Sequence, residues 1–267
     1  MRTIRKIEGG AGQMTDVYLC CDTITGLYSA IYDAWREHRE GEAKIAVQGN
    51  MEPELFCEYQ EVKESQKKAR AVEQLIRVNL GEEAYKELYY ALLSKDAGKG
   101  NAVFWTMQEA RKLKDSRKIM EHLDHPAVAK VFELSRNVAN EAHCFIEFIR
   151  FRELKNGILF SEIAPKNQIL TCIGEHFADR FPLENFMIFD KTHQVFLVHK
   201  EKSPWYLLWG EVPSEEAIHC VSDKELEYEK LWKNFFHTIA IEERKNPACQ
   251  RNHLPIRYRA DMPEFGE

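Results

Sequence analysis

The stretch EAHCFIEFIRFREL, residues 141–154, places a histidine, two arginines and three glutamates in a segment that otherwise reads as a β-strand. Successive side chains of a strand alternate between its two opposite faces. One face of this strand would carry Cys144, Ile146, Phe148, Arg150 and Arg152. GILFSEIA (157–164) follows a short turn and is expected to pair with it. The sequence therefore predicts that a sheet begins here, with two arginines side by side.

Downstream of this stretch, Pro165 introduces a helix that ends at EHFADRFP (175–182). Three short apolar segments follow, FMIFD, QVFLVH and PWYLLW, and each is typical of a strand. Their succession predicts an antiparallel meander. Ser222 and Glu225 form a capping-box pattern that begins a last long helix. We expect its apolar face to pack inward; this face comprises Tyr228, Leu231, Trp232, Phe235, Phe236 and Ile239.

Upstream, DVYLCC (16–21) reads as a strand, and a helix to about Arg39 follows it. Two more short strands, KIAVQ and LFCEYQEV, precede a mainly helical block over about 65–140. Breaks in this block, at Gly81, 95–100 and 124–127, predict four helices. The expected fold is α+β: an antiparallel meander flanked by helices, with the helical segment inserted after the N-terminal strands.

The chain organisation follows from the same pattern. Residues 1–15 are expected to be a flexible leader, 16–241 a single α+β domain, and 242–267 an irregular tail packed on that domain. The tail is basic: no acidic residue lies between 244 and 260, whereas five cations do, namely Arg244, Lys245, Arg251, Arg257 and Arg259.

Composition excludes several classes of protein. The net charge of −6 argues against a protein that coats nucleic acid along its length, so any such contact must be local. No apolar run suits a membrane span or a signal peptide, and we expect a cytoplasmic protein. The seven cysteines are scattered and the histidines lack ligand spacing, so we expect no metal. No cofactor fingerprint occurs either.

Two kinds of side chain could bind nucleic acid. Arg150, Arg152 and Arg180 could hold phosphates, because a guanidinium group matches two phosphate oxygens at once. Alternatively Arg150 and Arg152 pair with Glu162 or another carboxylate of the neighbouring strand. In the tail, Tyr258 between Arg257 and Arg259 suggests base stacking beside cations, as single strands require. The tail candidates are Lys245, Arg251, Arg257, Tyr258 and Arg259.

Three side chains are candidates for catalysis, although no complete catalytic constellation appears. His143 suits a general base, but the alternative of a histidine that hydrogen-bonds a turn of the chain is favoured. Glu153 would act as an acid only inside a pocket. His176 shares a helix face with Arg180, where the two could face a ligand or brace the helix end. Whether the chain is an enzyme stays open.

The segment RKLKDSRK (111–118) is the other basic feature. Arg111, Lys114 and Lys118 are expected on one face of a helix, with Arg117 beside them. Such a stripe could follow a phosphate backbone, or it could be a solvated helix face.

Taken together, EAHCFIEFIRFREL, HFADRFP, LWKNFF and the ending RKNPACQRNHLPIRYRADMPEF resemble a bacterial family of unknown function described as probable DNA metabolism or putative DNA repair proteins. The similarity runs from about Asp16 to the C-terminus. The residues that match are Glu141, His143, Arg150, Phe151, His176, Phe177, Arg180, Phe181, Trp232, Asn246, Pro247, Pro255, Tyr258 and Glu264. Cys144 departs from the arginine expected there.

The resemblance implies a pathway, because members are typically encoded beside a putative DNA-repair radical-SAM protein and related domains are fused to proteins like uracil-DNA glycosylases. We therefore expect an accessory protein of DNA repair or modification that binds single-stranded or damaged DNA and acts with a radical-SAM partner. An independent nucleic-acid-processing enzyme using His143, Glu153 and His176 is the alternative. A protein-docking adaptor is the third reading.

Overall fold

The computed structural model describes residues 15–37, 43–49, 54–210, 220–259 and 262–265. The chain groups into two compact units, 1–137 and 138–267, and the expectation of a single domain over 16–241 stays a prediction. The boundary falls inside helix α5 (Pro126–Phe148). Residues 1–14 of the expected leader lie outside the described part. Among the described residues, no helix combines the length and the apolar character that a membrane span needs.

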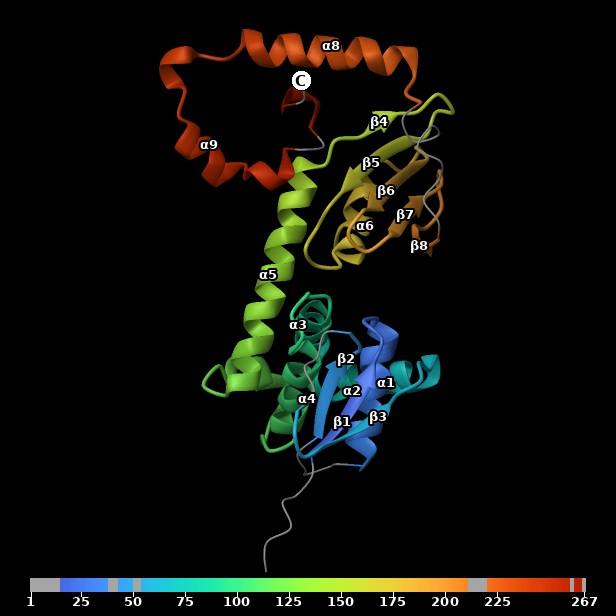
Figure 1. Ribbon diagram of the computed structural model, residues 1–267, viewed down its shortest axis with the longest axis vertical. Coiled ribbons are helices and arrows are strands. Elements are labelled where there is room, and N and C mark those ends of the chain that lie inside the picture. The colour runs from blue at the N-terminus through green and yellow to red at the C-terminus, as the bar shows by residue number, and fades with distance from the viewer. Residues whose placement is uncertain (1–14, 38–42, 50–53, 211–219, 260–261, 266–267) are drawn as a thin grey trace, which may run out of the picture. The chain divides into compact units, whose positions relative to one another are not determined.

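The first unit is an α/β fold built on a parallel sheet (Figure 1). Strand β1 lies in the middle, and β2 and β3 both pair with it in the parallel sense. Strands β2 and β3 are therefore not neighbours, and this sheet is parallel, whereas the fold predicted from the sequence was an antiparallel meander. The elements are β1 (Thr15–Cys20), α1 (Ile24–Glu37), β2 (Ala43–Val47), β3 (Cys57–Glu61), α2 (Gln66–Leu80), α3 (Glu82–Leu92), α4 (Lys99–Ala110), the 3-10 helix η1 (Ser116–Glu121) and the start of α5.

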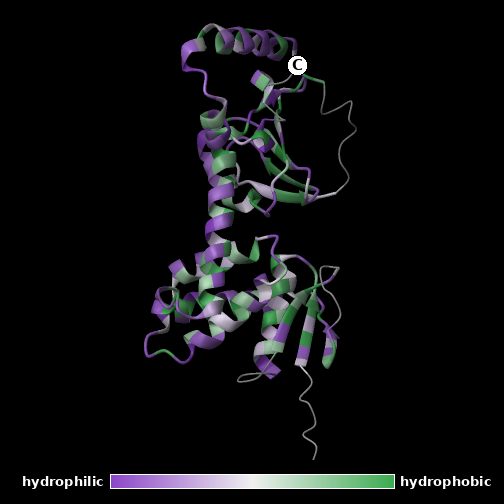
Figure 2. Ribbon diagram, turned by 60° about the vertical axis from the view of Figure 1, so that its left-hand side comes forward, coloured by the Kyte–Doolittle hydropathy of each residue, from purple (hydrophilic) through white to green (hydrophobic). Residues whose placement is uncertain are grey.

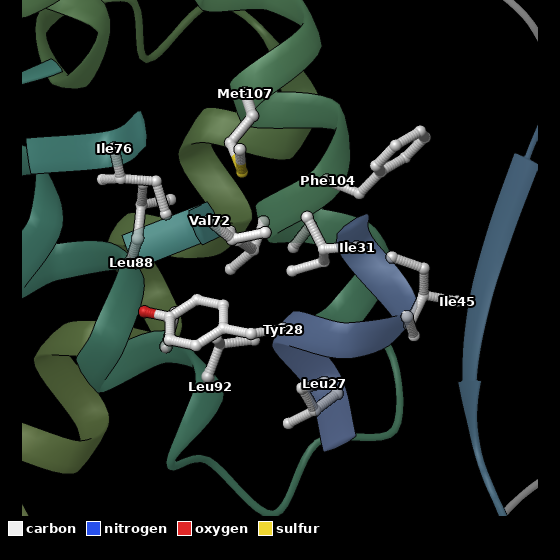
Figure 3. Packing of buried hydrophobic residues seen from close by; sticks show 14 of the residues in the cluster. Leu27, Tyr28, Ile31, Ile45, Val72, Ile76, Leu88, Leu92, Phe104 and Met107 are labelled. Atoms are coloured by element: carbon white, nitrogen blue, oxygen red, sulfur yellow. The ribbon is translucent and has the colours of Figure 1, made fainter. Parts of the chain in front are cut away.

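Helices and sheet of this unit share one hydrophobic core (Figure 3). Leu27 and Ile31 of α1 lie one turn apart and face Ile45 of β2 and Phe104 of α4. All four are buried. Helix α2 begins at the expected start of the helical block, because the Ser65 side chain accepts the N–H of Lys68 and caps the first turn.

The second unit contains a five-stranded mixed sheet in the order β4-β5-β6-β7-β8. Strands β6, β7 and β8 form the predicted antiparallel meander. Strands β5 and β6 are parallel, however, because helix α6 carries the chain back between them. The elements are β4 (Arg152–Glu153), β5 (Leu159–Ile163), α6 (Leu170–Arg180), β6 (Phe186–Asp190), β7 (Val195–His199), β8 (Tyr206–Trp209), α8 (Asp223–Thr238), η2 (Glu242–Arg244), α9 (Pro247–His253), η3 (Ile256–Tyr258) and η4 (Pro263–Phe265).

The opening stretch is mostly helix, and its prediction as a strand is wrong. Residues up to Phe148 complete α5, and only Arg152 and Glu153 form a strand. The physical reason is a buried stripe at helical spacing, Val131, Leu134, Val138, Ala142 and Phe145, which the local alternation hides. Arg150 therefore lies in the connection after the helix and does not share a long strand face with Arg152.

An ion pair of the first unit, in which the cation is buried and the carboxylate is exposed, gives a stability prediction. Lys99 is almost fully buried; its ammonium pairs with Asp22 and donates to the carbonyl oxygen of Ser94 at 2.7 Å. Asp22→Ala leaves a buried charge without its carboxylate, so we expect it to lower the free energy of unfolding by roughly 3 kcal/mol. Lys99→Met removes the charge and keeps an apolar chain of similar length, so its cost should be smaller. Urea denaturation of both variants tests this, and an equal or reversed order would contradict it.

Candidate functional site

A buried carboxylate near the C-terminal end of α5 organises the second unit. The Glu141 side chain is only 4% exposed. Its Oε1 accepts hydrogen bonds from the Lys166 backbone N–H at 3.0 Å and from Arg257 Nη1 at 2.9 Å. Its Oε2 accepts the backbone N–H of Asn167 at 2.9 Å and the Asn167 side-chain amide at 2.6 Å. One carboxylate therefore joins α5, the loop before α6 and the last part of the chain, residues 220–265, which we call the C-terminal segment.

A second ion pair joins the end of α5 to the C-terminal segment, with the signs of the two charges exchanged. Arg150, which follows α5, donates from Nη2 to Oε1 of Glu264 at 3.1 Å. The other oxygen of Glu264 accepts the indole N–H of Trp232, on α8, at 3.1 Å. The Glu264 side chain is 4% exposed, so its charge depends on these donors. We call Glu141, Arg150, Arg257 and Glu264 the C-terminal clasp.

Tyr258 lies at the centre of this region and is 6% exposed. Its ring centre lies 4.9 Å from that of Phe145, in an edge-on arrangement, and 5.3 Å from that of Phe148, in a tilted one. Its hydroxyl accepts a hydrogen bond from Arg257. Burial raises the pKa of its phenol to about 12, despite the nearby Arg257 charge, which lowers it. A nucleic-acid base therefore has no access to this ring, contrary to the stacking expected from the sequence.

Aromatic residues of the motifs EAHCFIEFIRFREL and HFADRFP meet beside the clasp. Phe151 contacts Phe177, Phe181 and Phe186 at ring distances of 5.3, 5.4 and 5.7 Å. The motifs around 151 and 177–181 thus pack together between α6 and β6. Their shared role in the structure is to hold α6 on the sheet.

The other predicted phosphate-binding arginines also have partners inside the protein. Arg152 pairs with Glu162 at 2.8 Å, which is the alternative weighed from the sequence. Arg259 donates twice to the Leu254 carbonyl oxygen, at 3.1 and 3.0 Å.

Arg180 lies exposed over the Phe181 ring, 5.6 Å from its centre. Of the tail cations, Arg251 and Lys245 are also exposed.

The three catalytic candidates lie on different elements. His143 is 74% exposed and pairs with Glu147 of the same helix at 3.2 Å. The backbone N–H of Glu153 donates to the Glu225 carboxylate at 3.1 Å, and His176 is an exposed ring against Phe177. Within the described residues, no hydrogen bond or ion pair joins any two of the three. The structure does not assemble them into a catalytic group.

A small hollow opens beside the clasp, lined among others by Arg150, Glu162, Arg257 and Tyr258. Its interior has room for about one water molecule. An organic substrate does not fit there without movement of the chain. The surroundings of the clasp therefore suit a structural junction better than a reaction centre.

Helix α8 differs most from its predicted role. It begins at the predicted cap, where the Ser222 side chain accepts the Glu225 N–H at 3.1 Å. None of its residues is buried, although its apolar face was expected to pack inward. Trp232 and Phe236 turn toward Glu264 and Phe265. A second stripe stays exposed: Tyr228, Leu231, Phe235 and Ile239, each 54–65% exposed. Figure 2 shows this mixture of hydrophobic and hydrophilic residues around the helix.

Comparison with protein families bears on the same region. A family model described as DUF4130, a domain of unknown function, matches residues 97–264, which is more than half of the chain. The chain belongs to the DUF4130 family. The part that matches DUF4130 includes all four clasp residues, α8 and α9. A comparison with curated proteins found no match.

The clasp gives a prediction with a control on the same helix. Glu141→Gln removes the charge that Arg257 faces and turns one acceptor into a donor, so the free energy of unfolding should fall by about 2–4 kcal/mol. Glu147→Gln breaks the exposed pair with His143 and should cost less than about 0.5 kcal/mol. Denaturant unfolding of the two variants measures both. Equal small effects would show that the buried carboxylate is dispensable.

Proposed function

We propose that this chain is an accessory protein of bacterial DNA repair or DNA modification, which binds nucleic acid through a local basic surface and acts with a radical-SAM partner. The resemblance of its motifs supplies the pathway. The observation that carries the proposal is that α8 and α9 remain exposed although both ends of the C-terminal segment are held. Near one end Glu225 accepts the Glu153 N–H, and near the other Glu264 accepts a hydrogen bond from Arg150.

The nucleic-acid surface that we propose is smaller than the sequence suggested. Arg150, Arg152 and Arg257 neutralise carboxylates inside the protein, so they contribute little positive potential outside it. Around α9 the exposed cations are Arg244, Lys245 and Arg251, on a stretch without acidic residues. A few phosphate contacts of this kind give weak binding that depends on salt.

In the described part of the chain, the geometry gives no support to the catalytic group that the alternative of an independent enzyme requires. His143, Glu153 and His176 each have surroundings of their own, and the hollow beside the clasp holds about one water molecule. A catalytic site for a nucleotide would need a larger pocket with convergent polar groups.

The exposed stripe of α8 supports a protein partner, and it also favours the adaptor as a second candidate function. Tyr228, Leu231, Phe235 and the C-cap residue Ile239 recur every three or four residues along about three turns. An amphipathic helix recognised through such a stripe is a common mode of protein docking. In the adaptor reading α8 binds the partner and α9 makes no DNA contact.

The first test is the salt dependence of DNA binding. Lys245→Ala with Arg251→Ala removes two proposed phosphate contacts, so the slope of log K against log salt on single strands should become flatter by about 1.4. Titration of a single-stranded oligonucleotide over a range of salt concentrations measures the slope.

The matched control is Lys67→Ala with Arg70→Ala, which removes two exposed charges from α2 and should leave the slope unchanged. An unchanged slope in the α9 variant would refute the α9 surface. No binding of the unmodified protein at low salt would leave the adaptor as the better proposal.

The second test concerns the partner. Leu231→Asp with Phe235→Asp places two charges in the exposed stripe, so co-elution with the proposed radical-SAM partner should be lost. Val78→Asp with Leu123→Asp alters two exposed apolar residues of the first unit and should retain co-elution. Retention of the complex by the α8 variant, with its melting temperature unchanged, would contradict α8 docking.

A further inference from the structure

The first unit carries a basic segment that the proposed function does not use. Residues 111–118, RKLKDSRK, contain five cations and one acidic residue in a chain whose net charge is −6. All five cations are exposed: Arg111, Lys112, Lys114, Arg117 and Lys118. We call this segment the basic connector, because it joins α4 to η1.

The basic connector is not the single helix that the sequence predicted. Helix α4 ends at Ala110 and η1 begins at Ser116, so Arg111, Lys114 and Lys118 do not share a helix face. Asp115 interrupts the helix, because its side chain accepts the Arg117 N–H at 3.2 Å and starts a new turn.

Several contacts nevertheless fix the backbone of the basic connector. The Ser116 hydroxyl donates to the Asn79 carbonyl oxygen of α2 at 2.9 Å. Ile119 is fully buried in the core, and Leu113 packs against that core. The cations therefore project from a rigid support, which reduces the conformational entropy that a ligand must remove on binding.

The charges of the basic connector are poorly neutralised. Lys112 pairs with Glu109 at 2.7 Å, and the guanidinium of Arg111 lies 5.2 Å from the centre of the Trp35 ring. For Lys114, Arg117 and Lys118, no carboxylate of the described chain lies within ion-pair distance. In the same unit Lys68, Lys99 and Lys130 all have carboxylate partners.

We propose that the basic connector is a second nucleic-acid contact and that it binds the phosphate backbone through Lys114, Arg117 and Lys118. The choice of nucleic acid among polyanions rests on the proposed function. The connector sequence contains no aromatic residue on which a base could stack, so it reads neither base nor strand type. Single- and double-stranded DNA of equal length should both depend on it.

The test is the triple variant Lys114→Ala, Arg117→Ala and Lys118→Ala. Loss of three phosphate contacts should flatten the slope of log K against log salt by about 2–2.7, on single- and double-stranded oligonucleotides alike. Its melting temperature should be unchanged, because the three side chains are exposed. The matched control is Lys63→Ala, Lys67→Ala and Arg70→Ala, three exposed cations of the same unit.

The outcomes separate this site from the α9 surface. A flatter slope for the connector variant, with no effect of Lys245→Ala and Arg251→Ala, would support the connector while refuting α9. An unchanged slope for the connector variant would overturn the present proposal. Poly-glutamate is the second probe: if the variant loses affinity for it as much as for DNA, the connector binds acidic polymers generally, and the assignment to nucleic acid is wrong.

Discussion

The second unit depends on two ion pairs of opposite orientation between the end of α5 and the C-terminal segment. Glu141 of α5 accepts a hydrogen bond from Arg257, and Arg150, which follows α5, donates one to Glu264. Both carboxylates are 4% exposed, so neither can replace its protein donors with water. Removal of one partner leaves a buried charge, which costs far more than an exposed ion pair contributes. Helix α5 and the last residues of the chain are therefore mutually dependent.

This constraint explains how α8 and α9 can be ordered without a core of their own. At one end Val221 bridges Leu154, the Ser222 N–H donates to the Glu153 carbonyl oxygen at 2.9 Å, and Glu225 accepts the Glu153 N–H. At the other end Glu264 and Tyr258 are held at the clasp. The segment between these anchors exposes apolar side chains on α8 and cations near α9. A large apolar exposure of this kind is typical of a surface that another molecule covers.

Local features of the fold could be predicted, and distant pairings could not. The β6–β8 meander followed from three short apolar segments with turn residues between them, and the α8 cap followed from Ser222. The strand at 141–148 was wrong because alternation and helical spacing coincide there, and the buried stripe that decides between them extends back to Val131. The parallel β5–β6 pair was missed because strand direction depends on where α6 packs.

The same distinction applies to the candidate site. The Arg152–Glu162 pair lies within ten residues of sequence and could be weighed in advance. Glu264 is 114 residues from Arg150, and Arg257 is 116 residues from Glu141, so no local pattern identifies them as partners. For Arg150 and Arg152 the sequence left a bound phosphate and a carboxylate of the chain as alternatives, and both arginines pair with a carboxylate of the chain. The exposed stripe of α8 was also missed, because apolar spacing does not reveal whether the facing surface belongs to the same chain.

The most direct test of the clasp is a double-mutant cycle on Arg150→Met and Glu264→Gln, read by hydrogen exchange of the amides in 255–259 and 262–265. Each single change should accelerate exchange there, and the double variant should be little worse than either. The coupling energy should then be about 1–3 kcal/mol. Additive effects, with a coupling energy near zero, would contradict the view that the Arg150–Glu264 ion pair holds the C-terminal segment in place.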